Sequence, residues 1–89
     1  MLRNNKQKSW NIVSEWGILS SRPNSRTGQD IEVRLTKTSW FGKMPQWDLR
    51  NWEPNFAGQG VVIGSNDDLH KLRDMLISVC EQIDENPEY

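Results

Sequence analysis

Residues 40–64 constrain the fold of this 89-residue chain more than any other stretch. Inside it, residues 47–52 read Trp-Asp-Leu-Arg-Asn-Trp, and this alternation predicts a β-strand whose side chains point to two faces in turn. Trp47 and Leu49 belong to the apolar face, and the opposite face carries Asp48, Arg50 and Trp52. An aromatic ring and a guanidinium on the face away from an apolar core need a partner. A nucleobase and a phosphate are the candidates.

Three further strands are predicted around this one. Residues 10–19 and 30–40 precede it, and the short apolar run 61–63 follows it. The first strand is expected to turn one set of side chains toward the core: Trp10, Ile12, Trp16 and Ile18. The second has an apolar side of Ile31, Val33 and Leu35, and a mixed side of Glu32, Arg34, Thr36, Thr38 and Trp40. Residues 20–29, rich in Ser, Arg, Asn and Gly, are expected to form a ten-residue loop.

A C-terminal helix is the clearest single element. Ser65, Asn66 and Asp67 supply capping oxygens, and acidic residues suit the positive end of a helix dipole. Apolar residues then recur at helical spacing: Leu69, Leu72, Leu76, Val79, Cys80 and Ile83. Asn86-Pro87 ends the helix. The predicted fold class is α+β, a four-stranded antiparallel sheet followed by one C-terminal helix (ββββα). This helix is expected to cover one face of the sheet and to leave the other face open.

The length of the chain fits one domain with a short arm. We expect a flexible basic arm at residues 1–9 and a folded domain at residues 10–86. Cys80 is the single cysteine, which excludes an internal disulfide, and its place in the apolar stripe predicts a reduced, buried thiol. No apolar run reaches the roughly 18 residues of a membrane span, and no signal peptide follows Met1. The expected compartment is the cytoplasm, with association with the nucleoid as an extension.

Charge is distributed unevenly along the chain. Residues 1–56 hold nine basic and five acidic side chains, a net charge of +4, whereas residues 57–89 hold two basic and seven acidic ones, a net charge of −5. The overall net charge of −1 therefore conceals a basic sheet region and an acidic helix region. This separation of charge is compatible with a polyanionic partner that binds the sheet region.

Catalytic chemistry is not expected. His70 is the only histidine and is predicted on the polar side of the helix. The chain offers no carboxylate pair, glycine-rich phosphate loop, metal-ligand spacing or nucleophile motif. We therefore expect no enzyme activity, catalytic residue, metal ion or cofactor.

The open sheet face is the predicted functional surface. Aromatic rings stack on nucleobases at roughly 1–3 kcal/mol each, while arginine and lysine contact the phosphates. The residues available on this face are Arg34, Trp40, Arg50 and Trp52, with Lys43 at the rim. The remaining tryptophans are expected to fill the core: Trp10, Trp16 and Trp47. For Arg50, an ion pair with Glu32 or Asp48 is the alternative to a ligand.

The order of these motifs resembles a known family. Ser39-Trp40, residues 47–52, the Gly-Gln-Gly-Val-Val run at 58–62 and the amphipathic helix follow one another as in the single-stranded-DNA-binding domain of transcriptional coactivator positive cofactor four. The resemblance is closest to its small bacterial relatives, the YdbC type, and covers about residues 10–85. It implies a curved ββββα sheet and a homodimer with paired grooves for single-stranded or melted DNA.

The resemblance also implies which residues contact DNA. The aromatic and basic positions of the family fall on Trp40 or Phe41, Lys43, Arg50 and Trp52, and Arg34 and Lys37 are expected on the same strand surface. Gln59 stands where relatives have lysine, and Val62 stands where they have serine or threonine. These departures put one phosphate contact in question and predict an affinity below the family's typical one.

The predicted function is sequence-nonspecific binding of single-stranded DNA by a homodimer that makes no membrane contact. Transcription regulation, replication and repair are the processes that such a protein serves. RNA binding is an alternative, because stacking does not distinguish the two sugars. A second alternative is a protein-interaction module whose open sheet face or edge docks another chain.

Overall fold

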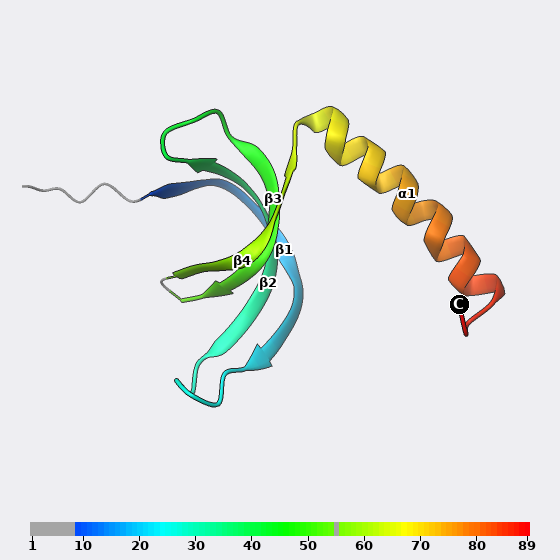
Figure 1. Cartoon of the computed structure of the whole chain (residues 1–89), viewed down its shortest axis with the longest axis horizontal. Coiled ribbons are helices and arrows are strands. Elements are labelled where there is room, and N and C mark those ends of the chain that lie inside the picture. The colour runs from blue at the N-terminus through cyan, green and yellow to red at the C-terminus, as the bar shows by residue number, and fades with distance from the viewer. Residues whose placement is uncertain (1–8, 55) are drawn as a thin grey trace, which may run out of the picture.

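The computed structural model describes residues 9–54 and 56–89, so the predicted arm lies outside the described residues except for Ser9. Four strands and one helix follow in the predicted order: β1 Trp10–Pro23, β2 Asp30–Trp40, β3 Gln46–Glu53, β4 Phe56–Gly64 and α1 Asn66–Glu85. Each strand pairs antiparallel with its neighbour in sequence, which gives one sheet of order β1-β2-β3-β4 (Figure 1). The predicted ββββα fold class is confirmed.

Two strands extend beyond their predicted ends. β1 continues to Pro23, which still pairs with Asp30, and the predicted loop shrinks to residues 24–29. β4 begins at Phe56, which pairs with Glu53 across a tight hairpin. Polar and glycine residues can extend a strand when the neighbouring strand supplies backbone partners. Side-chain alternation alone does not report that pairing.

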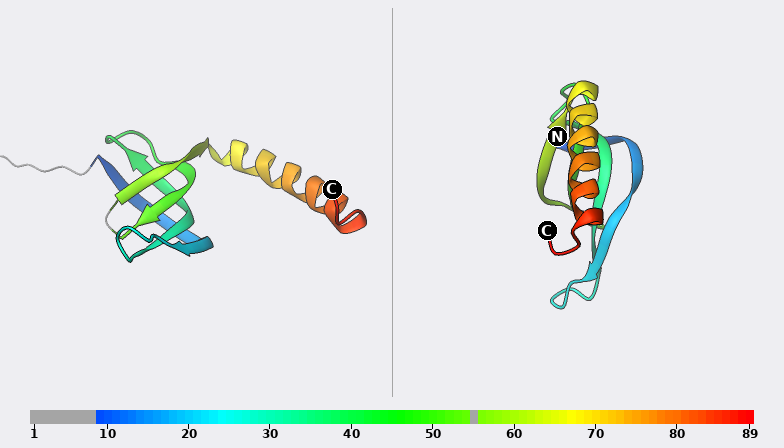
Figure 2. Two further views of the ribbon diagram at one scale, coloured as in Figure 1. Left: turned by 60° about the horizontal axis from the view of Figure 1, so that its bottom comes forward. Right: turned by 90° about the vertical axis from the view of Figure 1, so that its right-hand side faces the viewer.

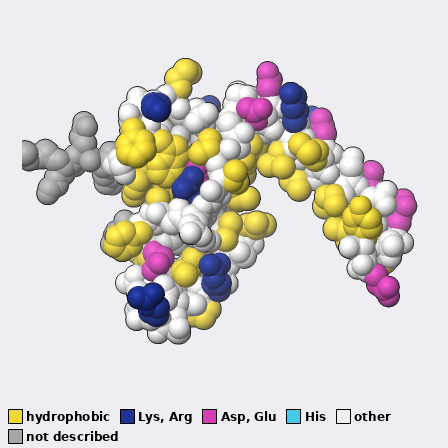
Figure 3. Space-filling view, viewed as in Figure 1, with side chains coloured by type: hydrophobic (Ala, Val, Ile, Leu, Met, Phe, Trp, Pro, Cys, Tyr) yellow, Lys and Arg dark blue, Asp and Glu magenta, His cyan; other side chains and the backbone are white. Residues whose placement is uncertain are grey.

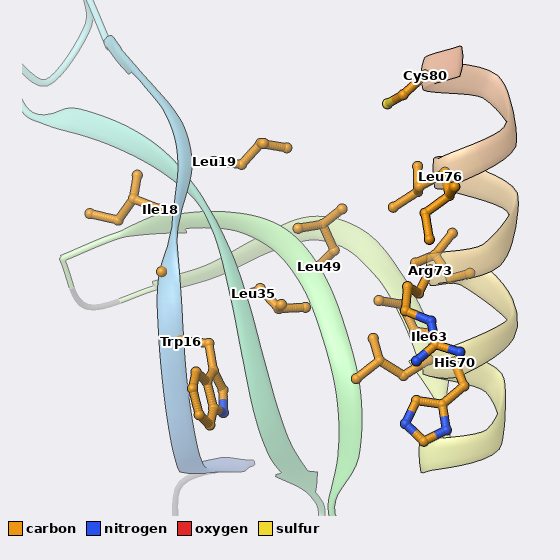
Figure 4. A pocket seen from close by; sticks show the side chains of 14 residues that line it. Trp16, Ile18, Leu19, Leu35, Leu49, Ile63, His70, Arg73, Leu76 and Cys80 are labelled. Carbon is orange, nitrogen blue, oxygen red and sulfur yellow. The ribbon is translucent and has the colours of Figure 1, made fainter. Parts of the chain in front are cut away.

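Register shifts in β1 move its side chains from one face of the sheet to the other. They lie between Ile12 and Ser14, between Glu15 and Gly17, and between Ile18 and Ser20. An extra residue at a bulge reverses the faces of the residues that follow. The prediction that Trp10, Ile12, Trp16 and Ile18 share one core-facing side is therefore wrong. Trp16 points to the side of the sheet that carries the helix and is 67% exposed (Figure 4).

The sheet is strongly curved, and its concave side faces away from α1 (Figure 1). Leu35 and Leu49 point toward α1 on the convex side (Figure 4), so the alternate residues of β2 and β3 point into the concave side. The side chains buried most completely among the described residues all belong to this concave set: Thr36, Thr38, Asp48 and Trp52. The core of the single chain thus lies on the face that the sequence predicted to be open.

α1 begins at a capping box whose N-cap is Ser65, one of the three residues predicted to supply capping oxygens. The Ser65 hydroxyl accepts a hydrogen bond from the Asp68 backbone N–H at 3.3 Å, and the Asp68 carboxylate accepts one from the Ser65 N–H at 2.9 Å. These two bonds satisfy backbone donors that the first helical turn leaves unpaired. At the other end, the Asn86 N–H donates to the Gln82 carbonyl, and the helix stops before Pro87.

The helix does not cover the sheet. All 20 residues of α1 are described and none is buried, and its contacts with the sheet are mainly with β4, the strand that leads into it. Figure 2 shows the helix leaving the sheet, and the described chain extends 61 × 36 × 16 Å. The prediction of a covered face is wrong for the single chain. Cys80 is exposed, so the prediction of a buried thiol is also wrong for the single chain.

Candidate nucleic-acid interface

A three-residue network lies on the concave face. The Arg50 guanidinium binds the Asp48 carboxylate through Nε–Oδ1 at 2.6 Å and Nη2–Oδ2 at 2.7 Å. Trp40 Nε1 donates to the same carboxylate at 3.2 Å, and the Arg50 guanidinium lies over the Trp40 ring at 4.4 Å from its centroid. A charge-assisted pair of this kind fixes the plane of the guanidinium. The result is a rigid stack of a cationic plane on an aromatic ring.

Trp52 is enclosed rather than presented to solvent. It is 2% exposed, and its ring packs edge-to-face against Trp10 with centroids 5.0 Å apart. Its Nε1 is the only buried side-chain nitrogen or oxygen in the described chain that has no hydrogen-bond partner. Trp52, a predicted stacking residue, is therefore on the predicted face. A base would contact its ring only through an opening between the side chains that enclose it.

The concave face is not basic. Arg34 pairs with Glu32 at 2.6 Å and with Glu15 at 2.9 Å, and Arg50 pairs with Asp48. The described strand residues on this face carry four carboxylates against these two guanidinium groups: Glu15, Asp30, Glu32 and Asp48. Their formal net charge is −2. The basic excess of the first half of the chain therefore does not lie in the concavity.

The turn between β2 and β3 presents exposed aromatic and basic side chains at the rim. Phe41 is 72% exposed and has a φ angle of 54°, in the left-handed region. The Lys43 N–H donates to the Trp40 carbonyl at 3.0 Å, and the Ser39 hydroxyl donates to the Lys43 carbonyl at 2.6 Å. This closed turn holds Phe41 and Lys43 outward beside the Trp40–Arg50 stack. Figure 3 shows hydrophobic side chains gathered on this part of the molecule with a basic side chain among them.

Lys37 does not belong to this surface. It pairs with Trp47 in the sheet and lies over the Trp47 ring at 5.5 Å, and Trp47 donates in turn to Asn66 at 2.8 Å. Strand alternation puts Lys37 and Arg34 on opposite faces. The prediction that Arg34 and Lys37 share one surface is wrong.

Two exposed side chains near the rim were absent from the sequence prediction. Met44 is 83% exposed in the β2–β3 turn, and Phe56 is 68% exposed at the β3–β4 hairpin. The available signal was a large apolar residue directly before Pro45 or two residues after Pro54, because turns seldom bury such residues. Among the predicted residues, the structure brings together Trp40, Phe41, Lys43 and Arg50. Arg34 is the cross-strand partner of Arg50 on the same concave face, and Trp52 follows Arg50 by two residues on β3.

A second surface, an apolar groove of about 710 Å³, lies between the convex face and α1 (Figure 4). Its walls are Trp16, Leu19, Leu35 and Leu49 of the sheet and Leu72 and Leu76 of the helix. His70 also lines this groove, so it does not lie on a purely polar side of the helix as predicted. Contiguous exposed apolar area of this kind marks a site of protein association.

Other kinds of site find no support in the described residues. Within residues 9–54 and 56–89, no group of three histidine, cysteine, aspartate or glutamate side chains could hold a metal ion. The one helix of this part of the chain does not have a stretch that is apolar over enough residues to cross a membrane.

Comparison with known proteins adds a relative but no family. No family model matches the chain. The chain is similar to an uncharacterized protein of Treponema pallidum (strain Nichols), with 29% identity over 72 residues that make up 79% of this chain and 78% of that protein. The two chains are thus alike over most of both their lengths, and the likeness carries no statement about function.

Proposed function

We propose that the protein is a homodimer that binds single-stranded DNA along the concave side of its curved sheet, without reading a defined sequence. It would act in the cytoplasm in transcription regulation, replication or repair. The observation that carries the proposal is the Arg50 guanidinium held over the Trp40 ring by Asp48, next to the exposed Phe41 and Lys43. Bases stack on both aromatic rings and arginine planes, so this cluster suits unpaired bases.

Lys43 and the β1–β2 hairpin supply the phosphate contacts. Among the described residues, Lys43 and Arg26 form no ion pair, in contrast to the two concave arginines. They lie at the rim of the sheet, Lys43 in the turn after β2 and Arg26 in the turn after β1. A strand that places its bases against the sheet would have its backbone near this rim. Few phosphates would then be neutralised, which favours modest affinity with a shallow dependence on salt.

The apolar groove supports the homodimer. The apolar groove and the exposed apolar side chains of α1 beside it are present in every copy of the chain. A two-fold axis would let the helix of one copy fill the groove of the other, as isologous dimers require. Leu76, Ile77 and Cys80, all exposed in the single chain, would then be buried. The buried thiol expected from the sequence would exist in the dimer.

Intrinsic tryptophan fluorescence tests the proposal. The full chain would be titrated with a single-stranded oligonucleotide, with the duplex of the same sequence and with the matching RNA, each at two salt concentrations. We expect quenching by the single strand, weaker quenching by the duplex, and a small loss of affinity at the higher salt. Equal binding of RNA would widen the ligand class to single-stranded nucleic acid. No response to any of the three by a folded protein would overturn the proposal.

A further inference from the structure

A small pocket on the concave side borders Trp52. It has a volume of about 340 Å³ and is lined by Gln29, Asp30, Glu32, Arg34, Trp52 and Pro54. This volume is at the lower end of the roughly 300–1,000 Å³ found for small-molecule sites. Glu32 lies directly opposite Trp52 in the β2–β3 ladder, and strand alternation puts Asp30 and Arg34 on the same face as Glu32. Charged groups of both signs therefore converge beside the indole.

The pocket contains hydrogen-bonding groups without partners. The carboxylate of Asp30 makes no hydrogen bond or ion pair with any described residue, whereas Glu32 is held by Arg34 at 2.6 Å. Trp52 is 2% exposed, and its Nε1 has no hydrogen-bond partner within the described chain. Native proteins seldom leave such a donor unpaired, and an orphaned one calls for an explanation. The pocket thus offers one unpaired acceptor, the Asp30 carboxylate, beside an indole whose own unpaired donor is enclosed.

The charge of the concave face decides which part of a nucleic acid can enter. The described strand residues there carry a net charge of −2, so a phosphate is repelled from the concavity. A neutral base is not repelled. Carboxylates accept hydrogen bonds and, when ionised, do not donate them. Asp30 therefore favours a base that offers N–H groups.

We propose that this pocket takes one nucleobase with an exocyclic amine, and that the protein consequently prefers cytosine to thymine at that position. The proposal rests on the proposed function and adds a base preference to it. The amine would donate to the Asp30 carboxylate, while the Arg34 N–H groups that Glu15 and Glu32 leave free would donate to acceptor atoms of the ring. In the same orientation, thymine would place its O4 carbonyl oxygen against the Asp30 carboxylate and its N3–H against the Arg34 donors, so both contacts would be lost.

Two homopolymeric oligonucleotides of equal length test this preference. Oligo-dC and oligo-dT have rings of one size, so a difference between them reports the exocyclic groups and the hydrogen at N3. At mildly alkaline pH, where oligo-dC stays unfolded, we expect tryptophan quenching to give a dissociation constant for oligo-dC that is lower by about fivefold or more. Binding of neither oligonucleotide would overturn the proposed function itself. Binding of oligo-dT with equal or higher affinity would overturn only the pocket proposal.

A matched pair of variants locates the preference. Asp30→Asn replaces an acceptor by an amide that can either accept from cytosine or donate to thymine, so we expect the ratio of the two dissociation constants to fall toward one. Asp67→Asn makes the same chemical change on α1, outside the pocket lining, and should leave the ratio unchanged. A preference that survives in Asp30→Asn, in a protein with a native circular dichroism spectrum, would overturn the assignment to this pocket.

Discussion

Arg50 binds Asp48 through two parallel contacts, with Nε 2.6 Å from Oδ1 and Nη2 2.7 Å from Oδ2, and the Asp48 side chain is fully buried. The same guanidinium donates to the Gly58 carbonyl at 3.0 Å, and the same carboxylate accepts from Trp40 at 3.2 Å. The Asp48–Arg50 ion pair of β3 therefore connects a side chain of β2, Trp40, with the backbone of β4 at Gly58. This pair stabilises the curved sheet and also fixes the cationic plane of the candidate interface.

Replacement of Asp48 by alanine should destabilise the fold strongly. The change leaves Arg50 largely buried without its carboxylate, and loss of one partner of a buried pair costs about 3–5 kcal/mol. The control is Asp74→Ala, which breaks the exposed pair with Arg73 and should cost about 0–1 kcal/mol. Urea unfolding followed by circular dichroism measures both. A loss for Asp48→Ala no larger than that for Asp74→Ala would show that the pair has no structural role.

The order of the elements was predictable from the sequence because each one follows its own periodicity. β2 spans residues 30–40 as predicted, since its side chains alternate cleanly. The helix is capped by Ser65, one of the three predicted capping residues, because capping depends on local sequence. The outer parts of β1 and β4 were missed, since their pairing is set by the neighbouring strand and by bulges rather than by alternation.

Alternation reveals two faces but does not tell which of them the sheet encloses. Leu35 and Leu49 suggested the core face, yet curvature encloses the polar face instead. Thr36 and Thr38 can be fully buried there because their hydroxyls hydrogen-bond each other at 2.6 Å. The ion pair of Arg50 with Asp48 was one of the sequence alternatives and is confirmed. Lys37 was misplaced, although its register relative to Arg34 already put it on the other face.

A charge in the apolar groove should abolish the proposed dimer. Leu76 is 50% exposed and lines the groove, so Leu76→Glu would bury a carboxylate against a second copy. We expect sedimentation equilibrium to show a dimer for the native chain and a monomer for this variant. Ser78→Glu adds the same group on a side of α1 that does not line the groove and should leave the dimer intact. A native chain that sediments as a monomer at high concentration would contradict the dimer.

The melting temperature should also report the dimer. A dimer is stabilised by mass action, so its melting temperature rises with protein concentration. We expect this rise for the native chain and for Ser78→Glu, and a concentration-independent, lower value for Leu76→Glu. A melting temperature that is independent of concentration in all three proteins would indicate that the groove stays open in solution.

Two rim variants should separate stacking from charge in binding. Phe41→Ala removes an exposed ring and should weaken single-strand binding by about 1–3 kcal/mol without changing its salt dependence. Lys43→Ala should reduce the slope of log affinity against log salt by about 0.7, the value for one phosphate contact of a single strand. Lys71→Ala, on the exposed surface of α1, is the control and should change neither quantity. An unchanged affinity and slope in both rim variants would move the binding surface elsewhere.

The free energy of unfolding should fall at acidic pH as Asp68, the acid of the helix cap, becomes protonated. Hydrogen bonds from the Ser65 backbone N–H and hydroxyl lower the pKa of Asp68 below its ordinary value of 3.8. Because the folded-state pKa is the lower one, this contribution is fully present above pH 3.8 and is lost as the pH falls through the folded-state pKa. Urea unfolding of the native chain and of Asp68→Asn should therefore differ at neutral pH and converge in acid. Asp67→Asn changes a neighbouring acid outside the capping box and should show a smaller difference from the native chain. A difference between the native chain and Asp68→Asn that persists at the acid end would assign the effect to something other than this carboxylate.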